Sequence, residues 1–171
     1  EDLLLLARLE SASTTDETDT VGMSDMLASV ADECASLRAD SPAISVDIQS
    51  PCRLRGDANQ LRSAVSNLVV NAVNHTASDG SVILRWEKKA DSGILRVIDD
   101  GEGIDHIHLP RLTERFYRVD AGRSREQGGT GLGLAIVKHI LNRHEARLEI
   151  KSQKNLGSEF TCIFPPSRLA C

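Results

Sequence analysis

The sequence predicts an α/β fold in which a mixed β-sheet is covered on one face by helices. Segments with the two-residue period of strands outnumber segments with helical periodicity. Some strands adjoin through short turns and others through helices, which indicates a mixed sheet. A length of 171 residues with 40% hydrophobic content suits one compact domain. Because few of these residues are aromatic, we expect a mainly aliphatic core.

The N-terminal part is predicted to hold two helices separated by a polar linker. Residues 1–10 have helical composition with leucines three and four positions apart, and we interpret them as the tail of a preceding helix. The chain starts with Glu1 rather than Met, which suggests an excised fragment. Residues 11–20 are polar and rich in Ser, Thr and acids, as in a solvated linker. Ser24 is expected to cap a second helix that runs to about Ala39.

The middle of the chain predicts strands around one long helix. Alternating apolar residues predict a strand over 44–48, and a brief strand is expected over 52–54. Residues 57–75 repeat apolar positions at helical spacing, with an aspartate in first place as a plausible cap. The β-branched segments 81–89 and 94–99 flank an Asp-Ser-Gly turn and predict a hairpin.

Residues 101–130 form a long irregular stretch, which we interpret as a lid. Glycines and charges interrupt every period there, and a compact domain rarely carries such a loop without a function for it. Helical periodicity resumes over 132–144, and two further strands are predicted over 147–151 and 159–164. Two prolines then end the last strand.

Composition argues against several classes of protein. The formal net charge of -5 disfavours a nucleic-acid partner. The longest apolar run, Leu3–Ala7, is far shorter than the roughly 18 to 20 residues that span a bilayer, so we expect a soluble piece without membrane contact. The cysteines lack the C-x-x-C spacing of a zinc site. We expect reduced thiols at all of them: Cys34, Cys52, Cys162 and Cys171.

A glycine-rich stretch, Gly128-Gly-Thr-Gly-Leu-Gly-Leu134, leads into the last helix. Its glycines let the backbone approach a ligand closely, and the first helical turn offers unpaired N–H groups to an anion. No Lys follows the last glycine, so it is not a P-loop, and its place before the final helix does not fit a dinucleotide fingerprint. The stretch predicts a phosphate cradle, although a flexible hinge would also explain it.

Two further stretches carry polar groups suited to a nucleotide. Asp99-Asp-Gly-Glu-Gly-Ile104 ends an apolar strand, so a carboxylate there could accept a hydrogen bond from the amine of a purine; an ordinary acidic turn is the alternative. Asn67, Asn71 and Asn74 or His75 share one helical face, and their carboxamide oxygens suit Mg²⁺. A polar surface face is the alternative for this second stretch.

In this order the three stretches resemble the N, G1 and G2 boxes of histidine kinases and of the wider family of DNA gyrase, heat-shock chaperone and mismatch-repair ATPases. The segment Thr113-Glu-Arg-Phe-Tyr-Arg-Val-Asp120 is similar to the F box of the kinases. The likeness covers about residues 23–165 and includes a closing strand that begins Gly157-Ser-Glu-Phe-Thr161.

The resemblance implies the Bergerat fold: a two-layer α/β sandwich of about five strands and about three helices, with an ATP lid over 101–130. It divides the chain into 1–10 (helix tail, expected to belong to the phosphoacceptor domain), 11–20 (linker), 21–166 (catalytic ATP-binding domain) and 167–171 (tail). It implies that Asn71, and nearby Asn67, ligate Mg²⁺ and that Asp99 recognises adenine.

The resemblance also implies roles for the remaining site residues. Gly101 and Gly103 would pass beneath the base, Arg115 or Arg118 would approach the γ-phosphate, and Phe116 would anchor the lid. The other residues expected to contact the nucleotide are Asn74, His75, Ile104, Tyr117, Gly129, Thr130, Gly131, Leu132, Gly133 and Thr161.

Three departures or differences qualify these expectations. Asn74 stands where the family usually has Lys or Arg, so one phosphate-facing charge is missing. Asn67 stands where the hydrolysing relatives have a glutamate base, and an amide cannot take a proton from water, so slow hydrolysis is expected. No histidine has the sequence context of the phosphoacceptor, and four are expected to be ordinary surface or helix residues: His106, His108, His139 and His144.

The resulting prediction is a protein-histidine kinase domain that binds Mg·ATP. The γ-phosphate would pass to a histidine on a separate dimerisation domain and then to a response regulator receiver domain. The parent is expected to be a homodimer in the inner membrane, with this domain in the cytoplasm. The alternatives are a protein-serine kinase of the anti-sigma type and a nucleotide-binding docking module that transfers no phosphate.

Overall fold

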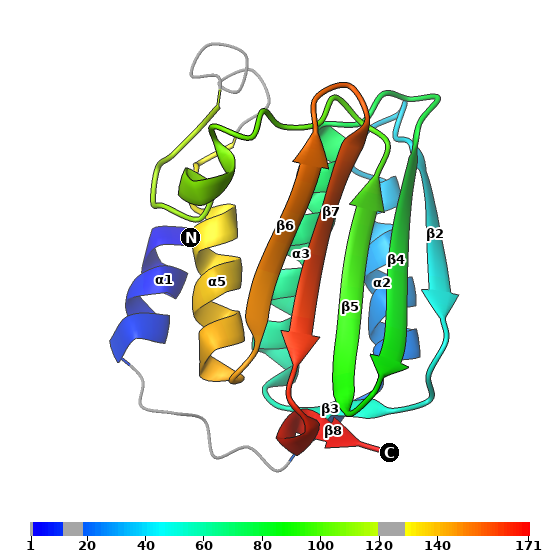
Figure 1. The fold of residues 1–171 in the computed structure, drawn as a ribbon, viewed down its shortest axis with the longest axis vertical. Coiled ribbons are helices and arrows are strands. Elements are labelled where there is room, and N and C mark those ends of the chain that lie inside the picture. Colours follow the sequence, from blue (N-terminus) through cyan, green and yellow to red (C-terminus); the bar gives the residue numbers. More distant parts are fainter. Residues whose placement is uncertain (1, 12–18, 120–128) are drawn as a thin grey trace.

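A five-stranded mixed sheet forms one layer of the computed structural model, which describes residues 2–11, 19–119 and 129–171. The strand order is β2-β4-β5-β7-β6, and only the β2/β4 pair is parallel (Figure 1). The strands in chain order are β2 (Ala43–Ile48), β4 (Ser81–Lys89), β5 (Ser92–Asp99), β6 (Arg147–Gln153) and β7 (Gly157–Phe164).

Helices cover one face of this sheet, as predicted (Figure 1). Helix α3 (Ala58–Asn74) packs between α2 (Met23–Ala35) and α5 (Gly133–Arg143), and α1 (Asp2–Ser11) packs on the outer side of α5. The helical layer therefore has the three helices that the resemblance implies, with α1 added at its edge.

Strand alternation decides which side chains enter the core. Val82, Leu84 and Trp86 alternate along β4 and are fully buried against the helices, because successive side chains of a strand point to opposite faces. The Trp86 ring lies edge-on to Phe164 with centroids 6.3 Å apart, and its Nε1 donates to the Cys52 carbonyl. Otherwise the core is mainly aliphatic, as expected from the composition.

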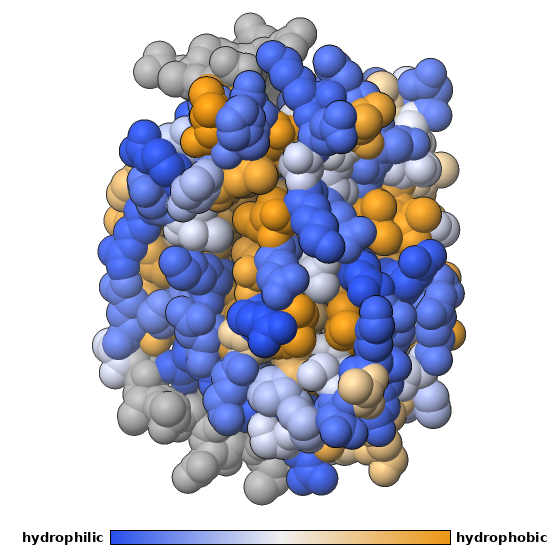
Figure 2. Space-filling model, in the orientation of Figure 1, coloured by the Kyte–Doolittle hydropathy of each residue, from blue (hydrophilic) through white to orange (hydrophobic). Residues whose placement is uncertain are grey.

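The other face of the sheet carries polar and apolar side chains together (Figure 2). Arg85 is paired with Asp47 across β2 and β4, and Arg96 is paired with Glu87 and Glu159 across β4, β5 and β7. In the part of the chain that the structure describes, no helix is both long and apolar enough to cross a membrane.

A small second sheet closes the end opposite the lid, and it corrects the prediction for the cysteines. Strands β1 (Thr20–Val21), β3 (Arg53–Arg55) and β8 (Leu169–Ala170) form it, with β3 in the centre. A disulfide joins Cys52 to Cys171 across 119 positions, so the expectation of four reduced thiols is wrong. The pairing arises from the β3/β8 contact, which no local spacing reveals. Cys34 and Cys162 are free and buried.

Two predicted boundaries of α2 are also wrong. Gly22, not Ser24, precedes the first turn, and the helix ends at Ala35 instead of about Ala39. The early end is explained by Arg38, whose guanidinium donates to the Asp40 carbonyl and to the Val73 carbonyl of α3, which turns the chain.

Other elements begin and end close to their predicted residues. Asp57 caps α3, as predicted, by accepting from the backbone N–H groups of Asn59 and Gln60. Of the predicted linker, Ser11 belongs to α1 and Thr20 to β1, whereas 12–18 lie outside the described residues.

Candidate nucleotide-binding site

An open cavity of about 1420 Å³ lies at the lid end of the sandwich. Its walls are the C-terminal end of α3, the loop that follows β5, the described part of the lid and the N-terminal end of α5. All three stretches that the sequence singled out therefore meet at one cavity, although they are spread over residues 67–134 of the chain.

Helix α3 turns its amide side chains into the cavity. Asn67, Asn71 and Asn74 line it, while the intervening Leu68 and Ala72 are fully buried on the opposite face. The Asn67 amide donates to the Ser63 carbonyl at 2.9 Å, which directs its Oδ1 toward the start of α5. The predicted amide row is therefore present.

His75 follows α3 and joins it to the loop after β5. Its Nδ1 lies 2.6 Å from Glu102 Oε1, and its carbonyl accepts the backbone N–H of Glu102. Both residues line the cavity. This pair holds the end of the amide row against the loop that begins at Asp99.

Asp99 ends β5 with its carboxyl group at the cavity wall, and only 6% of the residue is exposed. Burial raises the pKa of this carboxyl, although hydrogen bonds from the backbone of Gly101 and Ser158 oppose the rise. The neighbouring Asp100 is exposed and also lines the cavity, but its carboxylate accepts from the backbone and hydroxyl of Ser81, which lowers its pKa. Of these two aspartates, Asp99 is thus the one that offers a buried carboxylate to a ligand.

The glycines of the loop are required by close backbone contacts. A Cβ at Gly101 would collide with the His75 carbonyl oxygen, and one at Gly103 would collide with that of Gln153. Gly103 also has φ +65°, a conformation that favours glycine. The loop therefore packs closely between α3 and the β6/β7 turn, and Gly101, Gly103 and Ile104 line the cavity.

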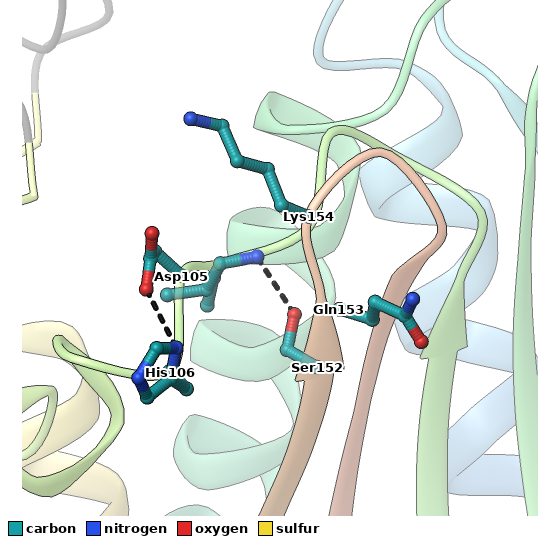
Figure 3. Close-up of a pocket in the computed structure, with 6 residues that line it drawn as sticks. Asp105, His106, Ser152, Gln153 and Lys154 are labelled. Carbon is teal, nitrogen blue, oxygen red and sulfur yellow. Dashed lines mark hydrogen bonds and ion pairs between the residues drawn. The ribbon is translucent and has the colours of Figure 1, made fainter.

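The start of the lid is tied to the β6/β7 turn beside a second, smaller cleft of about 220 Å³ (Figure 3). The Ile104 N–H donates to Ser152 Oγ at 2.7 Å, and the Asn155 N–H donates to the Glu102 carbonyl at 2.7 Å. His106 Nδ1 lies 3.0 Å from Asp105 Oδ1 on the outer side of this cleft (Figure 3). The first residues of the lid are thus anchored to the sheet.

The F-box segment contributes Tyr117 and Arg118 to the cavity. Arg118 Nη2 is buried and has no hydrogen-bond partner among the residues that the structure describes. A buried guanidinium nitrogen without a partner is costly, so an anion in the cavity would compensate it.

Two other F-box residues lie outside the cavity. Phe116 is 62% exposed, and its backbone, at φ +61°, donates its N–H to the Gly131 carbonyl at 2.9 Å. Arg115 forms an ion pair with Glu10 of α1. The structure therefore brings neither the expected lid anchor nor one of the two expected arginines to the cavity.

The glycine-rich stretch lies against the N-terminal end of α5. Gly129, Thr130, Gly131 and Gly133 line the cavity, whereas Leu132 is buried in the core. Among the described residues no side chain caps α5, which leaves its first N–H groups for an anion. Gly128 lies outside the described residues.

Thr161 was expected at the site, but its position separates it from the cavity. It pairs with Arg96 and Glu149 in mid-sheet, on the face that turns away from the helices, and its hydroxyl donates to Glu159. Ser158 lies opposite Asp99 in the register and lines the cavity instead. Side chains alternate between the two faces along β7, which begins at Gly157, so Ser158 and Thr161 lie on opposite faces. This alternation would have favoured Ser158.

Sequence reasoning also missed several residues around the cavity. Arg38 and Lys154 line it, and neither belongs to a motif. His108, expected to be an ordinary surface residue, lines the cavity and bonds to Tyr117. His144, expected to be similarly ordinary, lies away from the cavity and is fully buried, and its Nε2 accepts the Asp57 N–H at the start of α3. No local pattern marks these four residues, because their contacts come from distant segments or from the turn of the lid.

Known proteins match this chain in sequence and in structure. Residues 56–168 match the family described as histidine kinase-, DNA gyrase B-, and HSP90-like ATPase. The phosphate regulon sensor protein PhoR of Pseudomonas aeruginosa is 49% identical over 170 residues, which are 99% of this chain and 38% of that protein. The chain thus spans well under half of this relative.

Two solved structures extend the likeness to three dimensions. The mycobacterial sensor histidine kinase MprB has a TM-score of 0.77 at 27% identity, over 86% of this chain and 97% of that one. Full-length ShkA in complex with AMPPNP has a TM-score of 0.80 at 28% identity, over 96% of this chain and 34% of that one. With the family match over more than half of its length, this chain belongs to the histidine kinase-, DNA gyrase B- and HSP90-like ATPases, and its relatives include sensor histidine kinases.

Proposed function

We propose that this ATP-binding domain holds Mg·ATP in the large cavity and transfers the γ-phosphoryl group to a histidine of a dimerisation domain. The observation that carries the proposal is the convergence on one cavity of an amide row, a buried carboxylate and a helix end without a side-chain cap. Beside them lies Arg118, whose Nη2 has no hydrogen-bond partner in the described part of the chain. These groups suit a metal, a purine amine and a phosphate chain respectively.

The adenine would lie beside Asp99. Its exocyclic amine would donate to the Asp99 carboxylate, which burial keeps from competing water. Gly101 and Gly103 line the cavity and have no side chains that would cover the face of the base. The AMPPNP complex of the related ShkA supports nucleotide binding in this fold.

The phosphate chain would run toward the start of α5. The N–H groups after Gly129 and the guanidinium of Arg118 would accept its charge. Asn67 and Asn71 fit Mg²⁺, because carboxamide oxygens are hard, neutral donors and the Asn67 amide nitrogen is already engaged by Ser63. Magnesium would neutralise charge on the phosphates as the phosphoryl group departs.

Transfer rather than hydrolysis is the expected reaction. The Asn67 amide cannot take a proton from water, so the cavity lacks a base at that position. An imidazole nitrogen of the acceptor histidine would attack the γ-phosphorus as the bond to the β-phosphate oxygen breaks, and positioning would supply most of the catalysis. The phosphoryl group would then pass to a receiver domain of a response regulator. The parent would be a membrane-anchored homodimer with this domain in the cytoplasm.

Calorimetry with Mg·ATP and a transfer assay test the proposal. The wild-type chain should bind Mg·ATP, and Asp99→Asn should abolish binding, because the Gly101 N–H retains the amide oxygen and the amide NH₂ then faces the adenine amine, donor against donor. Asp91→Asn, in the exposed β4/β5 turn, should bind like wild type. With labelled ATP, a separately expressed acceptor domain should gain label that is lost in acid, as phosphohistidine is.

The other outcomes separate the alternatives. Absence of any binding heat from the folded protein would refute the proposal. Binding without transfer would favour a nucleotide-sensing or docking module, and label that survives acid would favour a protein-serine kinase.

A further inference from the structure

The lid contains a side-chain cluster that no sequence motif predicts. A 3₁₀ turn, η1 (Leu109–Arg111), and the turn after it bring His108 and Tyr117 together. His108 Nδ1 lies 2.6 Å from the Tyr117 hydroxyl and shares a hydrogen bond with it. Both side chains line the nucleotide cavity. The two ends of this lid segment are therefore tied at the cavity wall.

The Tyr117 ring is also held from a second direction. The Arg111 guanidinium lies 4.3 Å from the ring centroid, which is cation–π geometry. Arg111 Nε in turn donates to Glu114 at 3.1 Å. The ring is thus fixed by its hydroxyl and by its face, which leaves little freedom for the backbone at this point.

The fixed Tyr117 ring restrains the two neighbouring residues, Phe116 and Arg118. Phe116 is held at φ +61°, which is uncommon for a residue with a side chain and persists only where surrounding contacts impose it. Its N–H bonds to Gly131, so the F-box segment is also joined to the phosphate-cradle candidate. Arg118 follows directly and lines the cavity, and its Nη2 is buried without a hydrogen-bond partner among the described residues.

We propose that His108 is a positioning residue for nucleotide binding: its bond to Tyr117 fixes the turn from which Arg118 reaches the phosphate chain. The inference rests on the proposed function, since it needs a polyphosphate in the cavity. A guanidinium held in place before the ligand arrives loses less conformational freedom on binding. His108 itself contacts Tyr117 and acts only through it.

A purely structural role makes a different prediction. If the His108–Tyr117 bond only stabilised the lid, its loss would lower stability or weaken every ligand alike. If it positions Arg118, its loss weakens ligands with phosphates and spares adenosine. The loss also disappears once Arg118 has been removed.

The experiment compares Mg·ATP and adenosine by calorimetry. Tyr117→Phe removes only the hydroxyl, and His108→Ala removes the imidazole. Each should weaken Mg·ATP binding about 3- to 10-fold, the usual effect of one hydrogen bond, and leave adenosine unchanged. In an Arg118→Gln background neither change should weaken ATP further, because coupled residues are not additive. His106→Ala is the control, since that side chain is 88% exposed at the small cleft (Figure 3).

Each remaining outcome is decisive. Unchanged ATP affinity in both single variants, or a further loss in the Arg118→Gln background, overturns the role of His108 while the proposed function stands. Failure of the wild-type chain to bind ATP removes the proposed function and this inference together. If His108→Ala does not fold, the milder Tyr117→Phe variant decides alone.

Discussion

The charged residues that line the cavity are mostly acidic, which is unfavourable for binding a polyanion such as ATP. In the described part of the chain the lining carboxylates outnumber the lining cations. The carboxylates belong to Asp2, Asp79, Asp99, Asp100, Glu102 and Asp105, and the cations to Arg38, Arg118 and Lys154. Arg38 is partly engaged, because it donates to Val73 and to Asp40. Phosphate binding should therefore respond to one added positive charge.

Asn74→Lys should tighten Mg·ATP binding, about 3- to 10-fold at low salt, by placing an ammonium on the cavity face of α3. The gain should shrink at high salt, because mobile ions screen a partly exposed charge. Calorimetry at two salt concentrations measures both effects. Asn59→Lys, in the first turn of the same helix and exposed, should change neither. An unchanged or weaker affinity of Asn74→Lys would contradict the expectation.

His144 is a second residue whose surroundings decide its protonation. It is fully buried, its Nδ1 donates to the Ile140 carbonyl, and its Nε2 accepts the Asp57 N–H. This pattern requires the neutral ring, because protonated Nε2 could not accept. Burial accordingly lowers the pKa of His144 below its ordinary 6.5, and the nearby Arg168 and Arg143 lower it further.

The depressed pKa of His144 predicts acid-sensitive stability. The unfolded chain takes up this proton near pH 6.5 and the folded chain only at lower pH. The contribution of neutral His144 to the free energy of unfolding is therefore fully present above about pH 6.5. It falls as pH drops below that value, by up to about 1.4 kcal/mol per pH unit. Urea unfolding between pH 7 and 5 measures the slope. His144→Gln should flatten it and His139→Gln should not; equal slopes in all three proteins would contradict this assignment.

At the scale of elements, sequence periodicity correctly predicted the helices and strands that bury one face of a single segment. The helix capped by Asp57 and the hairpin over 81–99 form where predicted, because burial of one face repeats along each of them. The early end of α2 and strands β1 and β8 were not predictable. They depend on contacts with residues distant in sequence, such as Arg38 with Val73 and Leu54 with Leu169.

The residues of the candidate site also fall into two groups, those that local motifs predicted and those that only long-range contacts bring to the cavity. Contiguous motifs identified Asn71, Asp99 and Gly131 as cavity residues, because each motif bears its chemistry locally. Ser158 enters only through the β5/β7 register, and His108 only through the fold of the lid. Spacing in the sequence contains neither relation.

The β3/β8 contact with its disulfide yields a prediction about stability. Reduction should lower the free energy of unfolding by about 2–4 kcal/mol, since the bond closes a loop of 119 positions. Urea unfolding with and without dithiothreitol measures the difference. The free energy of unfolding of Cys171→Ser should equal that of the reduced wild type and should not change when dithiothreitol is added.

The thiol of Cys162 should stay unreactive in the folded protein, because burial raises its pKa to about 12.

On the scale of the whole molecule, the disulfide and the nucleotide-site candidate lie at opposite ends of the sandwich. The small sheet lies at one end, opposite the β6/β7 turn (Figure 1), and carries the disulfide. The cavity and the described part of the lid lie at the other end. Loss of the disulfide should therefore leave nucleotide affinity nearly unchanged. Helix α1 is the exception to this separation, because it lies along α5 and contacts the lid region: Thr130 donates to Asp2 at 3.0 Å, and Arg115 pairs with Glu10.

The Glu10–Arg115 pair makes α1 a restraint on the lid. Glu10→Gln should cost little stability, below about 1 kcal/mol, because both side chains are half-exposed. It should release Arg115 and thereby tighten Mg·ATP binding about 2- to 5-fold, since a freed guanidinium adds positive charge near the phosphates. Glu33→Gln, which breaks the Arg62 pair between α2 and α3, is the matched control and should leave affinity unchanged. If both variants bind ATP like wild type, α1 does not restrain Arg115 against the nucleotide.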